Sequence, residues 1–221
     1  MGKQVVVAGS THPCPPEKLV EYAHKLKEAG VKILHCDIMD GEFVGDKTFD
    51  YNKIKYLSEK VPLFLDVHLM VSEENLNLQK YIDAGAGLIT VHYETFKNKQ
   101  DIFKAFNTIR AGGVKVGLSI NPDTSVEELA PFIDVVDVVL IMLVEPGRSG
   151  QTMNCNVIYK VSQINDYRLE NNLNFKIQVD GGINGFNSFS VINAGTDIVV
   201  SGSYLYKSQD LSISVGQLLR V

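Results

Sequence analysis

The chain has 221 residues, of which 45% are hydrophobic and 21% are charged, close to the averages for a soluble globular protein. Its formal net charge is −5 at pH 7 and it has no run of basic residues, which excludes a nucleic-acid-binding surface. The longest apolar stretch, residues 135–144, is interrupted by Asp137 and is too short to cross a membrane.

The three cysteines are an odd number and have no CxxC spacing, which argues against a disulfide framework and against a cysteine-only metal site. The first residues, MGKQVVVAGS, lead directly into a strand-like run and show no secretory pattern. We therefore expect a cytoplasmic enzyme.

Four segments share one pattern, in which an Ala-Gly pair is followed by an apolar, β-rich run and then by polar or small residues. In chain order they read EAGVKILHCDI, DAGAGLITVHY, RAGGVKVGLSI and NAGTDIVVSGS. Each glycine is expected to end a helix in the left-handed conformation, and each run to form a strand. The glycines are Gly30, Gly85, Gly112 and Gly195. They are separated by 55, 27 and 83 residues, close to two, one and three repeats of about 27.5, so the chain holds about eight units.

The remaining units complete an alternation of strands and helices. Further strands are expected over residues 4–9, 62–70, 137–144 and 174–180. Helices are expected over residues 16–29, 51–60, 73–84, 101–111, 125–132, 157–169 and 186–194. Alternation implies a parallel sheet, and eight units favour closure into one α/β domain over residues 1–221, a (β/α)8 TIM barrel. An open doubly wound sheet is the alternative, but no GxGxxG follows the first strand.

Polar side chains gather at the carboxyl ends of the predicted strands, where the chemistry of a barrel collects. Strand periodicity places His35 and Asp37 on one face, toward the barrel mouth, and Asp66 and His68 likewise on the next strand. Asp180 ends the seventh strand. Each residue alone could be a hydrogen-bonded core residue or a cap. Two histidines and two aspartates that meet at one mouth are better explained by one divalent cation.

Glycine-rich segments follow the last three predicted strands. They are EPGRSGQ (145–151), DGGI (180–183) and SGS (201–203). Backbone N–H groups in such loops can form a nest for a phosphate group, and barrels commonly bind phosphate after strands seven and eight. The three segments together predict a phosphate site.

The segments HCDIMDGEFV, DVHLMV, VEPGRSGQ, VDGGI and SGS closely resemble the ribulose-phosphate 3-epimerase family, in family order over about residues 5–206. The resemblance implies a barrel of the ribulose-phosphate-binding type that holds one divalent metal ion, Zn, Fe, Mn or Co. The implied metal ligands are His35, Asp37, His68 and Asp180. Asp37 and Asp180 are also the implied acid and base, which invert carbon 3 of a ketose phosphate substrate by proton transfer through an enediolate.

The implied reaction converts D-ribulose 5-phosphate to D-xylulose 5-phosphate. Met39, Met70 and Met142 could be core filler, but at this mouth they are expected to pack over the reacting carbons and exclude water. The full set of expected substrate-binding residues is Ser10, His68, Met39, Met70, Met142, Gly147, Arg148, Ser149, Gly150, Gly181, Gly182, Gly202 and Ser203. We also expect a homo-oligomer.

The chain departs from the family pattern outside the four ligands. FVGD (43–46) stands where the family has FVPN, and THPCPP (11–16) replaces a Leu-Ser-Ala-Asp type stretch. Glu42 replaces a common histidine, and Arg148 and Ser149 replace Phe and Gly in the phosphate loop. An epimerase for a hexulose 6-phosphate, such as D-allulose 6-phosphate, therefore stays an alternative. A non-catalytic phosphosugar-binding protein is a remoter one, because it would not need both aspartates and both histidines.

Overall fold

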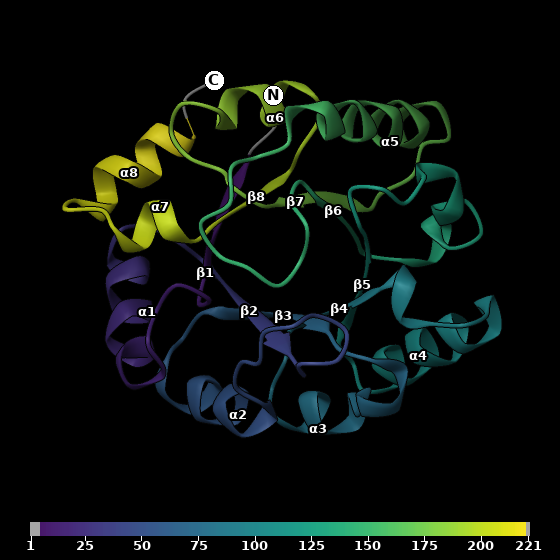
Figure 1. Cartoon of the computed structure of the whole chain (residues 1–221), viewed down its shortest axis with the longest axis horizontal. Helices are drawn as coiled ribbons and strands as arrows, with labels where there is room; N and C mark the ends of the chain where they lie inside the picture. Colours follow the sequence, from purple (N-terminus) through teal and green to yellow (C-terminus); the bar gives the residue numbers. More distant parts are fainter. Residues whose placement is uncertain (1–4, 220–221) are drawn as a thin grey trace.

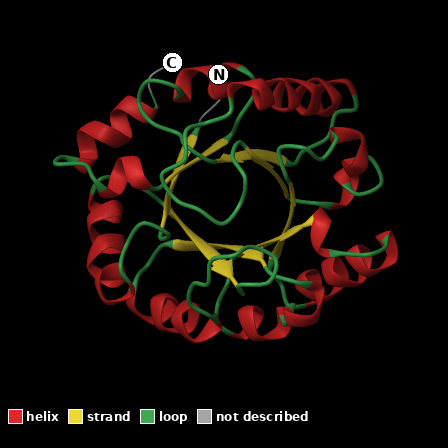
Figure 2. Ribbon diagram, in the orientation of Figure 1, coloured by secondary structure: helices red, strands yellow, loops and turns green. Residues whose placement is uncertain are grey.

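The computed structural model describes residues 5–219, so the expected first strand, 4–9, begins one residue outside the described part. Eight parallel strands follow one another around a closed barrel in chain order (Figures 1 and 2). They are β1 Val6–Ser10, β2 Ile33–Met39, β3 Phe64–Met70, β4 Leu88–His92, β5 Lys115–Ile120, β6 Val138–Met142, β7 Lys176–Asp180 and β8 Ile198–Ser201. The (β/α)8 TIM-barrel prediction is confirmed.

Helices form a ring outside the strands (Figure 2). They are α1 Leu19–Glu28, α2 Tyr51–Lys60, α3 Leu78–Asp83, α4 Lys99–Ala111, α5 Ile158–Glu170, α6 Ser188–Asn193, α7 Ser203–Tyr206 and α8 Leu211–Leu218. The sequence analysis did not predict α7 and α8. Within residues 5–219, every helix is too short or too polar to span a bilayer.

The prediction of a helix over residues 125–132 was wrong. Two short 3-10 turns, Val126–Leu129 and Ile133–Val135, connect β5 to β6 instead. Pro131 lacks the N–H that an α-helix would donate to the carbonyl of Glu127. That carbonyl accepts from the N–H of Ala130 at 3.2 Å, which closes a tighter turn.

Three of the four expected helix-ending glycines are left-handed: Gly30 (φ 89°), Gly85 (φ 93°) and Gly195 (φ 118°). In the third segment, RAGG, the predicted position of the left-handed glycine, Gly112, was wrong by one residue. Gly112 has φ −78° and caps α4, while Gly113 takes φ 75°. The second glycine of this segment permits the helix to run one residue further before the chain turns.

Strand β2 separates two environments. Leu34, Cys36 and Ile38 are buried in the large core between the strands and the helices. His35 and Asp37 alternate with them and are buried at 0% and 4% exposure. Because side chains alternate along a strand, these two polar residues face the inside of the barrel, as the periodicity predicted. Cys36 points to the helices.

A buried ion pair between Arg168 and Asp197 lies at the amino-terminal ends of β7 and β8. The Oδ2 atom of Asp197, just before β8, accepts from the Nη1 atom of Arg168 at 2.5 Å and from the N–H of Ile177 at 2.8 Å. Arg168, on α5, also donates to the carbonyl of Phe175 at 2.9 Å. The pair therefore joins one helix and two strands far from the barrel mouth.

Asp197→Ala should lower the free energy of unfolding by about 3–5 kcal/mol, because it removes the carboxylate that faces a buried guanidinium. Urea unfolding followed by circular dichroism measures the change. Glu21→Ala is the control, since its ion pair with Lys25 is exposed and should contribute little. Equal stability of the Asp197 variant and wild type would contradict the prediction.

Candidate active site

A cavity of about 680 Å³ opens at the carboxyl ends of the strands. The two expected catalytic aspartates, Asp37 and Asp180, line it. The lining also includes every expected substrate-binding residue except His68: Ser10, Met39, Met70, Met142, Gly147, Arg148, Ser149, Gly150, Gly181, Gly182, Gly202 and Ser203. His35 and His68 are fully buried next to the two aspartates. The barrel thus brings all the expected residues to one end.

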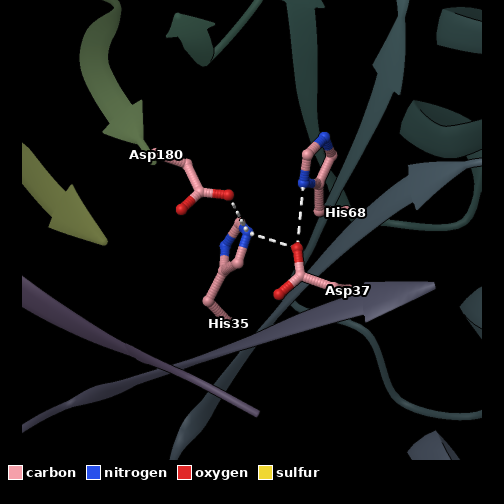
Figure 3. Close-up of side chains that lie close together, drawn as sticks. All are labelled: His35, Asp37, His68 and Asp180. Carbon is pink, nitrogen blue, oxygen red and sulfur yellow. Dashed lines mark hydrogen bonds and ion pairs between the residues drawn. The ribbon is translucent and has the colours of Figure 1, made fainter. Parts of the chain in front are cut away.

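The four expected metal ligands form one cluster (Figure 3). Each of His35, Asp37, His68 and Asp180 offers one ligand atom, and these atoms all lie within 4.8 Å of one another. The Nε2 atom of His35 lies 3.3 Å from Oδ1 of Asp37 and 3.7 Å from Oδ2 of Asp180. The Nδ1 atom of His68 lies 3.3 Å from Oδ1 of Asp37. Ligands about 2 Å from a tetrahedral cation stand about 3.3 Å apart, so the cluster has the spacing of a cation site.

Strand pairing explains how three of the four residues meet. In the parallel ladder of β2 and β3, His35 lies beside Asp66, and Asp37 lies beside His68. Asp180 comes from β7, where it pairs with the end of β6. Only closure of the barrel brings the fourth side chain to the other three.

A carboxylate orients His35. Its Nδ1 atom lies 2.6 Å from Oδ2 of Asp66, which also accepts from Nε2 of Gln178 at 2.6 Å. Burial lowers the pKa of His35, but the carboxylates of Asp66 and Asp37 outweigh burial and raise it well above its ordinary value. Nε2 has no hydrogen-bond partner within the described residues. The position therefore favours positive charge beside Nε2, which a bound cation would supply.

Sequence reasoning gave Asp66 no role and missed Gln178. Strand parity was the available signal for both. Asp66 alternates with buried apolar residues of β3, and Gln178 is a polar residue in the middle of the buried strand β7. Parity shows that such residues face inward, but it does not show which partner they reach.

The environment shifts the pKa values of the two aspartates in opposite directions. Burial, and then the charge of Asp37, raise the pKa of Asp180 to about 7. Burial would also raise the pKa of Asp37, but the charge of His35 holds it well below its ordinary value. The Oγ atom of Ser10 donates to Oδ2 of Asp37 at 2.8 Å. One carboxyl group suited to hold a proton and one suited to accept it are typical of acid–base pairs.

Apolar side chains form part of the cavity wall. Met39 and Met70 pack together with Val44 and the partly buried Phe43. Met142 belongs to a second small cluster on β6. Met39, Met70 and Met142 line the same cavity as the carboxylates of Asp37 and Asp180.

The loop after β7 approaches neighbouring backbone closely. A Cβ atom at Gly182, which has φ 67°, would lie 2.3 Å from the backbone nitrogen of Met153. At Gly181, with φ 125°, it would lie 2.9 Å from the backbone nitrogen of Val144. Glycine at both positions lets the loops after β6 and β7 pack backbone to backbone beside the cavity.

Comparison with known proteins gives a consistent result. The model of the ribulose-phosphate 3-epimerase family matches residues 6–206. A ribulose-phosphate 3-epimerase of Treponema pallidum is 39% identical, over 82% of this chain and 82% of its own. The enzyme of that name from Chlamydia muridarum is 33% identical, over 99% of this chain and 96% of its own. The chloroplastic ribulose-5-phosphate-3-epimerase of Arabidopsis thaliana is also 33% identical, over 96% and 75%.

Solved structures share the fold at low sequence identity. The 3-keto-L-gulonate-6-phosphate decarboxylase of Vibrio cholerae has a TM-score of 0.71 at 13% identity, with 98% of this chain and 96% of that chain covered. The 3-hexulose-6-phosphate synthase of Salmonella typhimurium has a TM-score of 0.70 at 16% identity, with 97% and 96% covered. At this identity the likeness concerns the fold alone.

Proposed function

Because this chain belongs to the ribulose-phosphate 3-epimerase family and is therefore an isomerase, we propose that it converts D-ribulose 5-phosphate to D-xylulose 5-phosphate. The observation that carries this proposal is the pair Asp37 and Asp180. Both carboxyl groups lie within 4 Å of Nε2 of His35, at 3.3 and 3.7 Å, and they line the same cavity.

The two carboxyl groups can invert carbon 3 by proton transfer. The ketone at carbon 2 makes the hydrogen on carbon 3 acidic, and inversion removes a proton from one face and adds one to the other. Asp37, on β2, and Asp180, on β7, come from different parts of the barrel wall, so the substrate can lie between them (Figure 3). One is ionised and accepts a proton, while the other holds a proton to deliver. General acid–base catalysis contributes about 10²–10⁴-fold, or about 3–5 kcal/mol.

The same residues would hold a divalent cation through His35 Nε2, His68 Nδ1 and one oxygen of each aspartate. A cation bound there, Zn²⁺, Fe²⁺, Mn²⁺ or Co²⁺, supplies a Lewis acid that stabilises negative charge developing on the substrate oxygens. Imidazole and carboxylate donors do not select sharply among these ions. Ser10 keeps Asp37 oriented through its hydrogen bond, and Met39, Met70 and Met142 exclude water.

We assign the phosphate group of the substrate to the glycine-rich segments 147–150, 181–182 and 202–203. The support is that these residues line one side of the cavity that holds Asp37 and Asp180. Backbone N–H groups donate hydrogen bonds to phosphate oxygens without the side-chain entropy that long basic residues lose.

Deuterium exchange tests the function and the choice of substrate. The protein loaded with a divalent cation is incubated in D₂O with D-ribulose 5-phosphate, and separately with D-allulose 6-phosphate, and carbon 3 is observed by NMR. We expect exchange and epimerisation of the pentulose phosphate. Efficient turnover of the hexulose phosphate alone would replace the proposed substrate. No exchange with either compound would instead support a phosphosugar-binding protein.

Arg148→Ala should raise KM for D-ribulose 5-phosphate by about tenfold with little change in kcat, if the guanidinium contacts the phosphate in both the ground state and the transition state. Arg148 lines the cavity on the loop after β6. Steady-state kinetics measure both constants. Lys104→Ala is the control, because Lys104 lies on the exposed side of α4 and pairs with Asp101. An unchanged KM in the Arg148 variant would show that the guanidinium points into solvent and does not contact the phosphate.

A further inference from the structure

A chain of hydrogen bonds lies behind His68 and leads away from the cavity. The Nε2 atom of His68 lies 2.8 Å from Nε2 of His92, the last residue of β4. The two rings are 18° from parallel with centroids 4.9 Å apart, the edge-to-edge arrangement of an in-plane hydrogen bond. The Nδ1 atom of His92 then lies 3.1 Å from Oε2 of Glu94. Neither His92 nor Glu94 belongs to the four-residue cluster.

The second carboxylate oxygen of Glu94 also accepts hydrogen bonds. Its Oε1 atom accepts from the N–H of Asn121 at 2.8 Å and from the hydroxyl of Thr124. Burial raises the pKa of Glu94, but the hydrogen bonds from His92, Asn121 and Thr124 outweigh burial and lower it. Glu94 is therefore an ionised carboxylate, which can only accept hydrogen bonds.

The ionised carboxylate of Glu94 determines which atom donates and which accepts in each hydrogen bond between Glu94 and His68. Since the carboxylate of Glu94 only accepts, Nδ1 of His92 carries a proton and donates. The His92 ring is fully buried and, as a neutral imidazole, carries only that one proton, so its Nε2 atom is a bare acceptor. His68 must then donate from Nε2. A neutral His68 with its proton on Nε2 has a bare Nδ1 atom, 3.3 Å from Oδ1 of Asp37.

The opposite direction of donation fails on the same contacts. If Nδ1 of His68 donated to Asp37, Nε2 of His68 would be bare. His92 would then have to donate from Nε2, and its bare Nδ1 atom would face the Glu94 carboxylate at 3.1 Å. Two facing acceptors repel each other, and burial makes such a pair costly. The first direction also sets Nδ1 of His68 against Oδ1 of Asp37, but a cation held by both residues would offset that repulsion, whereas His92 and Glu94 are outside the cluster.

We propose that His92 and Glu94 are positioning residues, which fix the proton of His68 on Nε2 and hold the lone pair of Nδ1 toward the cation. The proposal rests on the metal-dependent function proposed above. It makes the two histidine ligands alike, because each has a carboxylate behind it: Asp66 directly behind His35, and Glu94 through His92 behind His68. Such partners raise the metal affinity of a histidine ligand.

Neighbouring residues hold this hydrogen-bond chain in place. The Nζ atom of the buried Lys160, on α5, donates to the carbonyls of Thr124 at 2.5 Å, Asn121 at 3.4 Å and Pro122. It thereby holds the loop that binds Glu94. The ring centroid of Phe43, which packs with Met39 and Met70, lies 5.0 Å from the ring centroid of His92. A hydrogen-bond chain that is held at both ends, and whose two histidines are fully buried, is suited to orient a ligand.

Affinity for Zn²⁺, measured by competition with a chromophoric chelator, tests the proposal without a need for activity. Glu94→Ala should weaken binding by about 10–100-fold while the fold, followed by circular dichroism, is retained. Glu94→Gln keeps an oxygen toward His92 and should recover most of the affinity. Tyr93→Phe is the matched control, because it removes a hydrogen bond from the same turn, to Glu128, and should bind like wild type.

Wild-type affinity in Glu94→Ala would overturn the inference and leave the proposed function intact. A wild-type protein that binds no Zn²⁺ would overturn both. A second measurement needs no variant: ¹⁵N NMR of the Zn²⁺-loaded wild-type protein should show His68 protonated at Nε2 and bound to the metal through Nδ1. A proton on Nδ1, or Zn²⁺ on Nε2, would contradict the proposal even if Glu94→Ala does not fold.

Discussion

Asp37→Asn and Asp180→Asn should each reduce the rate of net epimerisation by about 10²–10⁴-fold, because each removes the only proton carrier on one face of carbon 3. Both side chains lie at the cavity, and both are proposed metal ligands, so the assays need saturating cation and a measured metal content. Asp83→Asn is a suitable control, since Asp83 lies on the exposed surface of α3 and accepts a hydrogen bond from Gln79.

The same variants test whether each carboxyl group serves one face. With metal retained, Asp180→Asn should still let Asp37 exchange the hydrogen on carbon 3 of one epimer with D₂O, without inversion. Asp37→Asn should do the same with the other epimer. If either metal-loaded variant interconverts the epimers near the wild-type rate, the two-carboxylate mechanism is wrong. Exchange of both epimers by each variant would contradict only the assignment of one face to each residue.

Prolonged chelation should reduce activity by about 10³-fold or more, because the Lewis acid contributes several kcal/mol to stabilising the charge on the substrate. One divalent ion per chain should restore turnover. The positive charge favoured beside Nε2 of His35, and the 3.3 Å spacing of the donors, support this expectation.

Two matched histidine variants test whether metal binding depends on the histidines of the cluster. His68→Gln should lose tight binding of the ion, while His24→Gln, on the exposed side of α1, should bind like wild type. Metal content by elemental analysis and turnover are measured on the same samples. Full turnover by protein shown to be metal-free would rule out metal dependence.

The alternation of strands and helices could be predicted from local sequence. Helix ends and strand periodicity depend on residues close together in the chain, which is why an Ala-Gly pair followed by an apolar run located four strands. Prediction from local sequence failed where the same residues allowed two local conformations. Gly112 and Gly113 could both end α4, and the segment before Pro131 could form either an α-helix or 3-10 turns.

Strand parity also predicted which side chains face the barrel interior. His35, Asp37 and His68 share that side because an extended backbone turns alternate side chains to opposite faces, whatever surrounds it. Asp180 joined this set because it ends the seventh predicted strand, and the resemblance to the family implied the same four ligands. The identity of the four candidate ligands was thus available before the structure.

Only the tertiary structure decided what supports these ligands. Gln178 donates to Asp66 from 112 residues away. Glu94 is linked to His68 through His92, and a loop that Lys160 holds in place binds Glu94. These contacts depend on strand register and barrel closure, and a hydrogen bond is lost if its atoms move by about 1 Å. The sequence by itself determined which polar residues enter the barrel, because that follows from backbone periodicity. Which nitrogen of each histidine faces the other candidate ligands was decided by packing between strands distant in the chain.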